Sequence, residues 1–167
     1  MAAAPTTTPA TTPATTGTRD APARLELTRR PGTGPDAVLL ADHGVDLRGA
    51  LVVEAGCGSG HNTAHLAGLG ARAVGVDLDH ARLARARASY GRVPGAEFVH
   101  AEAAAYLRGL PARTADAVLS VFGAFSFHPA GPLLRACSHA LRPGGLLLIT
   151  LRASDTTDHV TLLRRTG

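Results

Sequence analysis

The chain repeats one unit along most of its length: a short apolar run, a turn, and a segment with helical patterning. The apolar runs are Ala50–Ala55, Arg72–Asp77, Ala96–His100, Ala115–Val121 and Leu146–Leu151. Helices are expected between them over 62–69, from the N-cap Asp79 to Tyr90, over 102–108 and over 133–141. Strands that alternate with helices form parallel sheets, because each right-handed crossover places a helix on a sheet face. The sequence therefore predicts an α/β fold: a doubly wound parallel sheet of about five strands with helices on both faces.

The first 22 residues differ from the rest of the chain, because nearly all of them are Ala, Pro or Thr. Such a segment buries too little apolar surface to offset the entropy cost of ordering. We therefore expect a disordered tail over 1–22. A single domain is expected over 23–167, since a chain of 167 residues has the length of one ordinary domain.

Composition argues against several classes of partner. All 17 basic residues are Arg, the net charge is +4 and aromatic residues make up 4%. Nucleic-acid surfaces combine basic stretches with stacking aromatics, so no nucleic-acid partner is expected. No run reaches the roughly 18 apolar residues of a membrane-spanning helix, so no membrane partner is expected. Cys57 and Cys137 form no CxxC pair and no metal-ligand spacing, which favours a reducing, cytoplasmic location without a metal site.

A glycine cluster, GCGSG over 56–60, follows the first apolar run. Glycines let the chain turn sharply and let backbone N–H groups approach a ligand closely. Asp77 ends the second run, where a carboxylate can accept hydrogen bonds from both hydroxyls of a ribose. A dinucleotide fingerprint G-x-G-x-x-G that begins at Gly56 needs its third glycine at position 61, which is His61. The spacing therefore predicts a nucleoside ligand without a pyrophosphate.

The run VVEAGCGSG resembles the first motif of class I S-adenosylmethionine-dependent methyltransferases, which have a Rossmann-like fold. GVDLD (75–79) is similar to the second motif, FVHAEA (98–103) to the third, and LRPGGLLLIT (141–150) to the fifth-strand region. This resemblance implies S-adenosylmethionine as the cofactor. It implies that Asp77 accepts from the ribose diol, Glu102 from the adenine amine, and that the Ala103 N–H serves a ring nitrogen. The cofactor-binding residues that it implies are Glu54, Gly56, Cys57, Gly58, Gly60, Asp77, Leu78, Glu102 and Ala103.

The same resemblance implies an enzyme of the EC 2.1.1 class that methylates a small-molecule acceptor. Methyltransferases of base amines carry an Asn/Asp-Pro-Pro-aromatic run after the fourth strand, whereas this chain has SVFG over 120–123. His128 follows that region, and we expect it to be a general base or a substrate contact.

Each site residue also has a structural interpretation. The glycine cluster can be a tight strand-to-helix turn, and Asp77 a solvated strand end. Glu54 can be a buried acid satisfied by loop amides, and Glu102 can simply begin a helix. Cys57 is expected to fill space, because the sequence places no base beside it. His61 is expected to be a polar residue at a helix start rather than a contact of the methionyl carboxylate.

Other functions stay open beside methyl transfer. One is a non-catalytic methyltransferase-like module that binds the cofactor or a protein partner, or a truncated fragment. Another is a nucleotide-sugar or NAD-type enzyme, which the glycine spacing disfavours. The family usually follows the fifth strand with a helix and two more strands, whereas residues 153–167 can form only part of that helix. We therefore expect a C-terminally incomplete domain that lacks the last two strands, with an apolar edge at Leu146–Leu151 that pairs in a homodimer.

Overall fold

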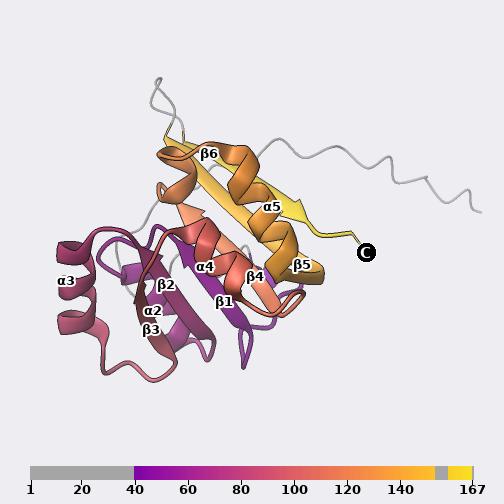
Figure 1. The fold of residues 1–167 in the computed structure, drawn as a ribbon. Coiled ribbons are helices and arrows are strands. Elements are labelled where there is room, and N and C mark those ends of the chain that lie inside the picture. The colour runs from indigo at the N-terminus through magenta and orange to yellow at the C-terminus, as the bar shows by residue number, and fades with distance from the viewer. Residues whose placement is uncertain (1–39, 153–157, 167) are drawn as a thin grey trace, which may run out of the picture.

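The computed structural model describes residues 40–152 and 158–166, which form one six-stranded sheet with helices on both faces (Figure 1). The strand order is β3-β2-β1-β4-β5-β6, in which β1 to β5 are parallel and β6 is antiparallel to β5. The strands are β1 (Leu51–Ala55), β2 (Arg72–Asp77), β3 (Ala96–His100), β4 (Ala115–Val121), β5 (Leu141–Arg152) and β6 (Asp158–Arg164). The helices are α2 (His61–Gly68), α3 (His80–Tyr90), α4 (Ala103–Gly109) and α5 (Ala130–Ala140), with a 3₁₀ turn, η1, at Ala124–Ser126.

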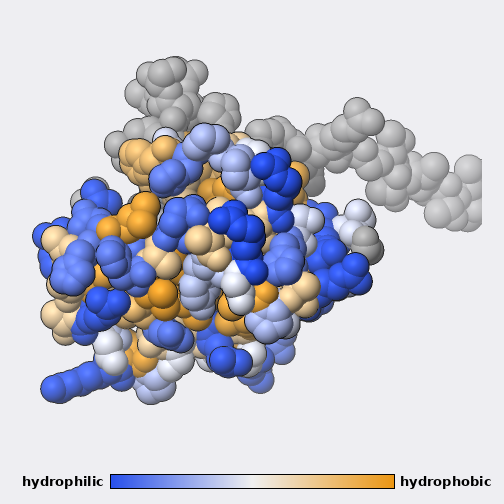
Figure 2. Space-filling model, viewed as in Figure 1, coloured by the Kyte–Doolittle hydropathy of each residue, from blue (hydrophilic) through white to orange (hydrophobic). Residues whose placement is uncertain are grey.

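Alternating side chains on the central strands build the core on both faces of the sheet. In β1, Val53 packs with α4 and α5, whereas Val52 packs with α2 on the opposite face. In β5, Leu147 faces the α4 and α5 side and Leu148 faces the α2 side. Figure 1 shows α4 and α5 together in front of the sheet. On the face drawn in Figure 2, hydrophilic residues cover much of the surface and hydrophobic residues appear between them in small groups.

The two helices that follow β2 and β3 begin at acidic caps. The Asp79 carboxylate accepts from the backbone N–H of Arg82 at 2.9 Å, and this hydrogen bond lowers the pKa of Asp79. The Glu102 carboxylate accepts from the N–H groups of Ala104 and Ala105 at 2.8 and 2.7 Å. Each side chain satisfies donors that have no partner inside the helix.

The α/β prediction is confirmed, and β2, β3 and β4 have the predicted bounds. The prediction for the C-terminal segment is wrong in part, because 158–164 form strand β6 instead of part of a helix. This strand pairs with β5 from Leu146↔Arg164 to Arg152↔Asp158, and Leu162 packs against the core on the α2 side. The edge of β5 is therefore paired within the chain, which removes the reason for expecting a dimer through that edge.

Some expectations lie outside the described residues. The tail over 1–22 is among them, and so is the start of the domain over 23–39. Within residues 40–152 and 158–166, no helix has both the length and the apolar character needed to cross a bilayer.

Candidate functional site

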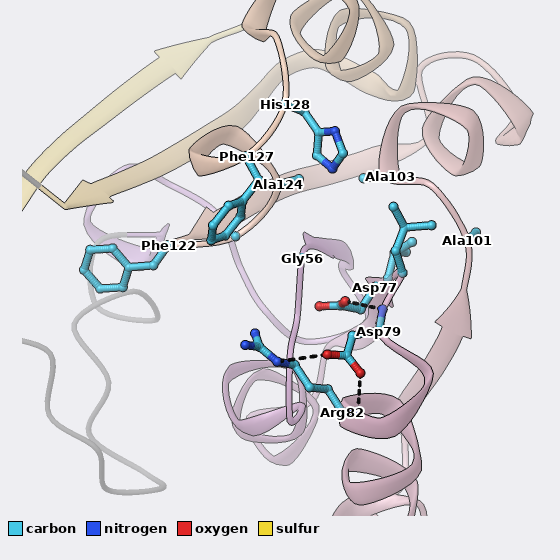
Figure 3. A pocket seen from close by; sticks show the side chains of 13 residues that line it. Gly56, Asp77, Asp79, Arg82, Ala101, Ala103, Phe122, Ala124, Phe127 and His128 are labelled. Atoms are coloured by element: carbon cyan, nitrogen blue, oxygen red, sulfur yellow. Dashed lines mark hydrogen bonds and ion pairs between the residues drawn. The ribbon is translucent and has the colours of Figure 1, made fainter.

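A cavity of about 260 Å³ opens at the carboxyl ends of β1, β2 and β4, which is where ligands bind in sheets of this type. Figure 3 shows Phe127 and His128 on the side formed by the segment after β4, and Asp77, Asp79 and Arg82 on the opposite side. Five of the residues predicted for the site line this cavity: Gly56, Asp77, Leu78, Ala103 and His128.

Glycines bring the loop after β1 into backbone contact with the loop after β4. Gly56 has a φ of +83°, and a Cβ there would lie 2.5 Å from the backbone nitrogen of Ala124. A Cβ on Gly123 would lie 2.3 Å from the carbonyl oxygen of Ala55. Neither position has room for a side chain, so the two loops can meet at the cavity lining only because both residues are glycine.

Gly60, at the end of the glycine loop, packs against an aromatic ring of β3. Its φ is +79°, and a Cβ would lie 2.4 Å from Cε1 of Phe98 and 2.8 Å from Cβ of Ala86. Gly58 has a φ of +54°, but the nearest atom to its Cβ would be 3.8 Å away. The two glycines therefore share a left-handed backbone and differ in the space around them.

Gly60→Ala is expected to lower the free energy of unfolding by about 2 kcal/mol, because overpacking adds to the backbone strain. Gly58→Ala is the matched control, with an expected loss of about 1 kcal/mol from the backbone alone. Urea unfolding followed by circular dichroism measures both. Equal losses in the two variants would contradict the packing role of Gly60.

Glu54 is buried beneath the glycine loop, where its carboxylate holds the first turn of α2. One oxygen accepts from Nδ2 of Asn62 at 2.9 Å, and the other accepts from the backbone N–H of Thr63 at 2.9 Å and from the Thr63 hydroxyl. Glu54 is not among the residues that line the cavity. The geometry gives it a positioning role, in agreement with the structural interpretation of this acid.

Asp77 links the glycine loop to the cavity. Its Oδ2 accepts from the backbone N–H of Gly58 at 2.7 Å, and its Oδ1 accepts from the N–H of Asp79 at 2.8 Å. A carboxylate offers about four acceptor positions, so each oxygen keeps one lone pair for a ligand. The two amides orient the carboxylate, and its position on the lining leaves it able to bind a diol.

The segment after β3 presents backbone rather than a carboxylate to the cavity. Glu102 is not a lining residue, and both of its oxygens cap α4, with Nη2 of Arg108 at 3.9 Å. Ala103 is the first residue of α4 and lines the cavity. An N–H at this helix position has no acceptor inside the helix, so it is available to a ligand. Leu78 lies nearby on the same lining and is half exposed.

Cys57 is buried and fills the space between β2 and α2. A Cβ on Gly75 would lie 2.8 Å from its Sγ atom. Burial raises the pKa of the Cys57 thiol, and the nearby charges of Glu54 and Asp77 raise it further. A thiol held protonated in this way is a poor nucleophile, which agrees with the space-filling interpretation.

The two histidines considered for the site have different surroundings. His128 is exposed and lines the cavity, and its backbone N–H donates to the carbonyl of Ala124 at 3.0 Å. His61 lies on α2, where Nδ1 is 2.9 Å from the hydroxyl of Tyr90, and it is not a lining residue. Of these two histidines, only His128 therefore lines the cavity.

Eight residues that line the cavity are not among the predicted site residues: Val76, Asp79, Arg82, Ala101, Phe122, Gly123, Ala124 and Phe127. Nε of Arg82 is 3.3 Å from Oδ2 of Asp79, and the pair is exposed. The phenylalanines had a signal in the sequence, because three of the four in the chain fall within FGAFSF over 122–127. Within the residues that the structure describes, no three His, Cys, Asp or Glu side chains are grouped as metal ligands.

Comparison with known families identifies the same part of the chain. Residues 53–149 match the family described as the methyltransferase domain. A probable S-adenosylmethionine-dependent methyltransferase of Mycolicibacterium smegmatis is 32% identical over 102 residues, which make up 61% of this chain and 38% of that protein.

Solved structures agree with the fold. An S-adenosylmethionine-dependent methyltransferase from Mesorhizobium loti is 28% identical with a TM-score of 0.56, over 68% of this chain and 52% of that one. A structure solved for the conversion of a disulfide bond into a thioacetal group during echinomycin biosynthesis is 32% identical with a TM-score of 0.56, over 70% of this chain and 49% of that one. This chain thus spans about half the length of the solved structures, and less of the mycobacterial relative.

Proposed function

This chain belongs to the methyltransferase domain family, and we propose that it binds S-adenosylmethionine in the cavity beside Asp77 and transfers the methyl group to a small-molecule acceptor. The observation that carries the proposal is the convergence of the Asp77 carboxylate, the first N–H of α4 at Ala103 and the glycine turn at Gly56 on one cavity.

The lining residues fit the nucleoside part of this cofactor. Asp77 has free lone pairs for the ribose hydroxyls, and Ala103 offers an N–H to a ring nitrogen of adenine. Leu78 offers an apolar contact to the adenine face. Gly56 presents backbone without a side chain to the lining, and the methionyl part would lie against this turn. We propose no direct contact of the cofactor with Glu54, Cys57, Gly60 or Glu102. The first three support the glycine loop through hydrogen bonds or packing, and the carboxylate of Glu102 caps α4.

S-adenosylmethionine, when bound, supplies a sulfonium methyl group that a nucleophilic atom attacks in line, and S-adenosylhomocysteine is the leaving group. The chain contributes orientation of donor and acceptor and exclusion of water. His128 is the residue on the lining that can take the proton released by a hydroxyl or amine acceptor.

The proposed acceptor is a small molecule rather than a nucleic acid, in line with the low aromatic content and the absence of the base-methylation motif. The similar structure solved for the conversion of a disulfide bond into a thioacetal group during echinomycin biosynthesis also supports this choice. A reducing, cytoplasmic setting also belongs to the proposal, because Cys57 and Cys137 are both free and buried.

Isothermal titration calorimetry tests the cofactor assignment. We expect S-adenosylmethionine and S-adenosylhomocysteine to bind with saturation and NAD to give no heat of binding, because the cavity suits a nucleoside without a pyrophosphate. Saturable NAD binding without a response to either thioether would contradict the proposal. Thioether binding without product from any acceptor in a broad panel would favour the alternative, a module that binds the cofactor without turnover.

A further inference from the structure

We call the cavity beside Asp77 the cofactor cavity. A second cavity, of about 570 Å³, adjoins it on the side of β5. It is lined by Phe122, Phe125, Ser126, Phe127 and Leu151. Phe122 and Phe127 line both cavities, so the two spaces meet at these two rings. A methyl acceptor must lie beside the donor, and this second cavity occupies such a position. We call it the aromatic cavity.

The described residues that line the aromatic cavity carry no charge. Among these five described residues, Ser126 alone has a polar side chain, and the other four are phenylalanine or leucine. The charged lining residues Asp77, Asp79 and Arg82 belong to the cofactor cavity alone. A charged acceptor placed in the aromatic cavity would lose hydration without gaining a partner, which disfavours its binding.

Phe127 leaves an unusually large apolar surface in water beside the site, because it is 78% exposed. Leu151 is also exposed, at 37%, on the same cavity. Large apolar side chains left exposed around a concave site are typical of ligand-binding surfaces. Aromatic rings there can stack on a flat ligand.

The backbone of this segment is held in a conformation that a phenylalanine rarely adopts. Phe122 has a φ of +49°, in the left-handed region. Its N–H donates to the carbonyl of Thr150 at 2.9 Å, and the N–H of Phe125 donates to Oγ of Ser120 at 3.2 Å. These bonds tie the backbone that carries the rings to β4 and β5. Strain of this kind concentrates at functional sites.

We propose that the aromatic cavity binds the methyl acceptor and that this acceptor is an uncharged molecule with a flat aromatic body. The inference rests on the proposed function. The aromatic body lies against Phe127 and Leu151, and the nucleophilic hydroxyl or amine is directed past Phe122 toward the cofactor cavity. In the transfer, the nucleophile forms a bond to the methyl carbon as the carbon–sulfur bond breaks, and its proton passes to His128.

The test uses 2-naphthol, an uncharged hydroxyarene, followed by its own fluorescence, which no tryptophan overlaps because the chain has none. We expect saturable binding to the wild-type chain. Phe127→Ala and Leu151→Glu should each weaken it about tenfold, through loss of ring contact and through a new charge in the cavity. Leu163→Glu is the matched control, because Leu163 is a similarly exposed leucine on β6 that lines neither cavity, and it should leave binding unchanged.

S-adenosylhomocysteine affinity separates the two proposals. Leu151→Glu should keep wild-type affinity for it, because Leu151 does not line the cofactor cavity. If S-adenosylhomocysteine binds but 2-naphthol does not, the acceptor inference is overturned and the proposed function stands. The same conclusion follows if 2-naphthol binds all the variants equally. Binding of the anion naphthalene-2-sulfonate as tightly as 2-naphthol would also overturn it. If S-adenosylhomocysteine does not bind, the proposed function fails, and the acceptor assignment fails with it.

Discussion

Replacing Asp77 with alanine is expected to weaken S-adenosylhomocysteine binding about a hundredfold while the domain stays folded. A hydrogen bond to a charged group contributes about 1.5–3 kcal/mol, and Asp77 is placed to accept from two ribose hydroxyls. In the wild-type chain the N–H of Gly58 donates to Oδ2 of Asp77, and the substitution removes this acceptor. The glycine turn would then be less fixed when the ligand arrives. Calorimetric titration of the variant measures the loss.

The control for this experiment is Asp46→Ala. Asp46 is an exposed carboxylate that accepts one backbone N–H, from Arg48 at 3.0 Å, and it does not line the cavity. Its removal should leave the affinity for S-adenosylhomocysteine unchanged. If Asp77→Ala binds as tightly as the wild-type chain, the ribose assignment is wrong.

Much of the fold could be predicted because its signals are local. Most of the parallel strands follow a short apolar run in the sequence, as in Arg72–Asp77, and α3 begins at the predicted cap Asp79. The strand β6 could not be predicted in this way. Its seven residues, DHVTLLR, have no strict alternation, and they become a strand because β5 offers an unpaired edge. That cause lies in the tertiary structure.

The site was predictable to a lesser degree. Of the residues predicted from the first two motifs, Gly56, Asp77 and Leu78 line the cavity, whereas Glu54, Cys57, Gly58 and Gly60 do not. Glu102 differs, because its carboxylate caps α4 instead of facing the cavity. The sequence GAEFVHAEA fits both outcomes, since an acid before a helix is a good cap and also a good ligand group. The left-handed backbone of Phe122, directly before the close approach of Gly123 to Ala55 and Gly56, has no sequence signal, because phenylalanine rarely adopts it.

Glu54→Ala is expected to lower the free energy of unfolding by about 3 kcal/mol, more than any other substitution considered for this chain. The carboxylate is 2% exposed and accepts from the Asn62 side chain, the Thr63 N–H and the Thr63 hydroxyl. Its removal leaves the N–H and hydroxyl of buried Thr63 without an acceptor. These donors lie in the first turn of α2, directly after the glycine loop, so the loop loses its anchor as well.

Glu54→Gln distinguishes lost hydrogen bonds from a lost side chain, because glutamine keeps the volume but exchanges one acceptor oxygen for an NH₂ donor. That NH₂ group would face either Asn62 or Thr63, both of which donate to the carboxylate. We therefore expect Gln to recover only part of the stability, about 1 kcal/mol, in urea unfolding of the three chains. Full recovery by Gln would mean that packing alone explains the loss. A wild-type midpoint for Glu54→Ala would mean that solvent reaches Thr63 and that Glu54 does not hold the glycine loop.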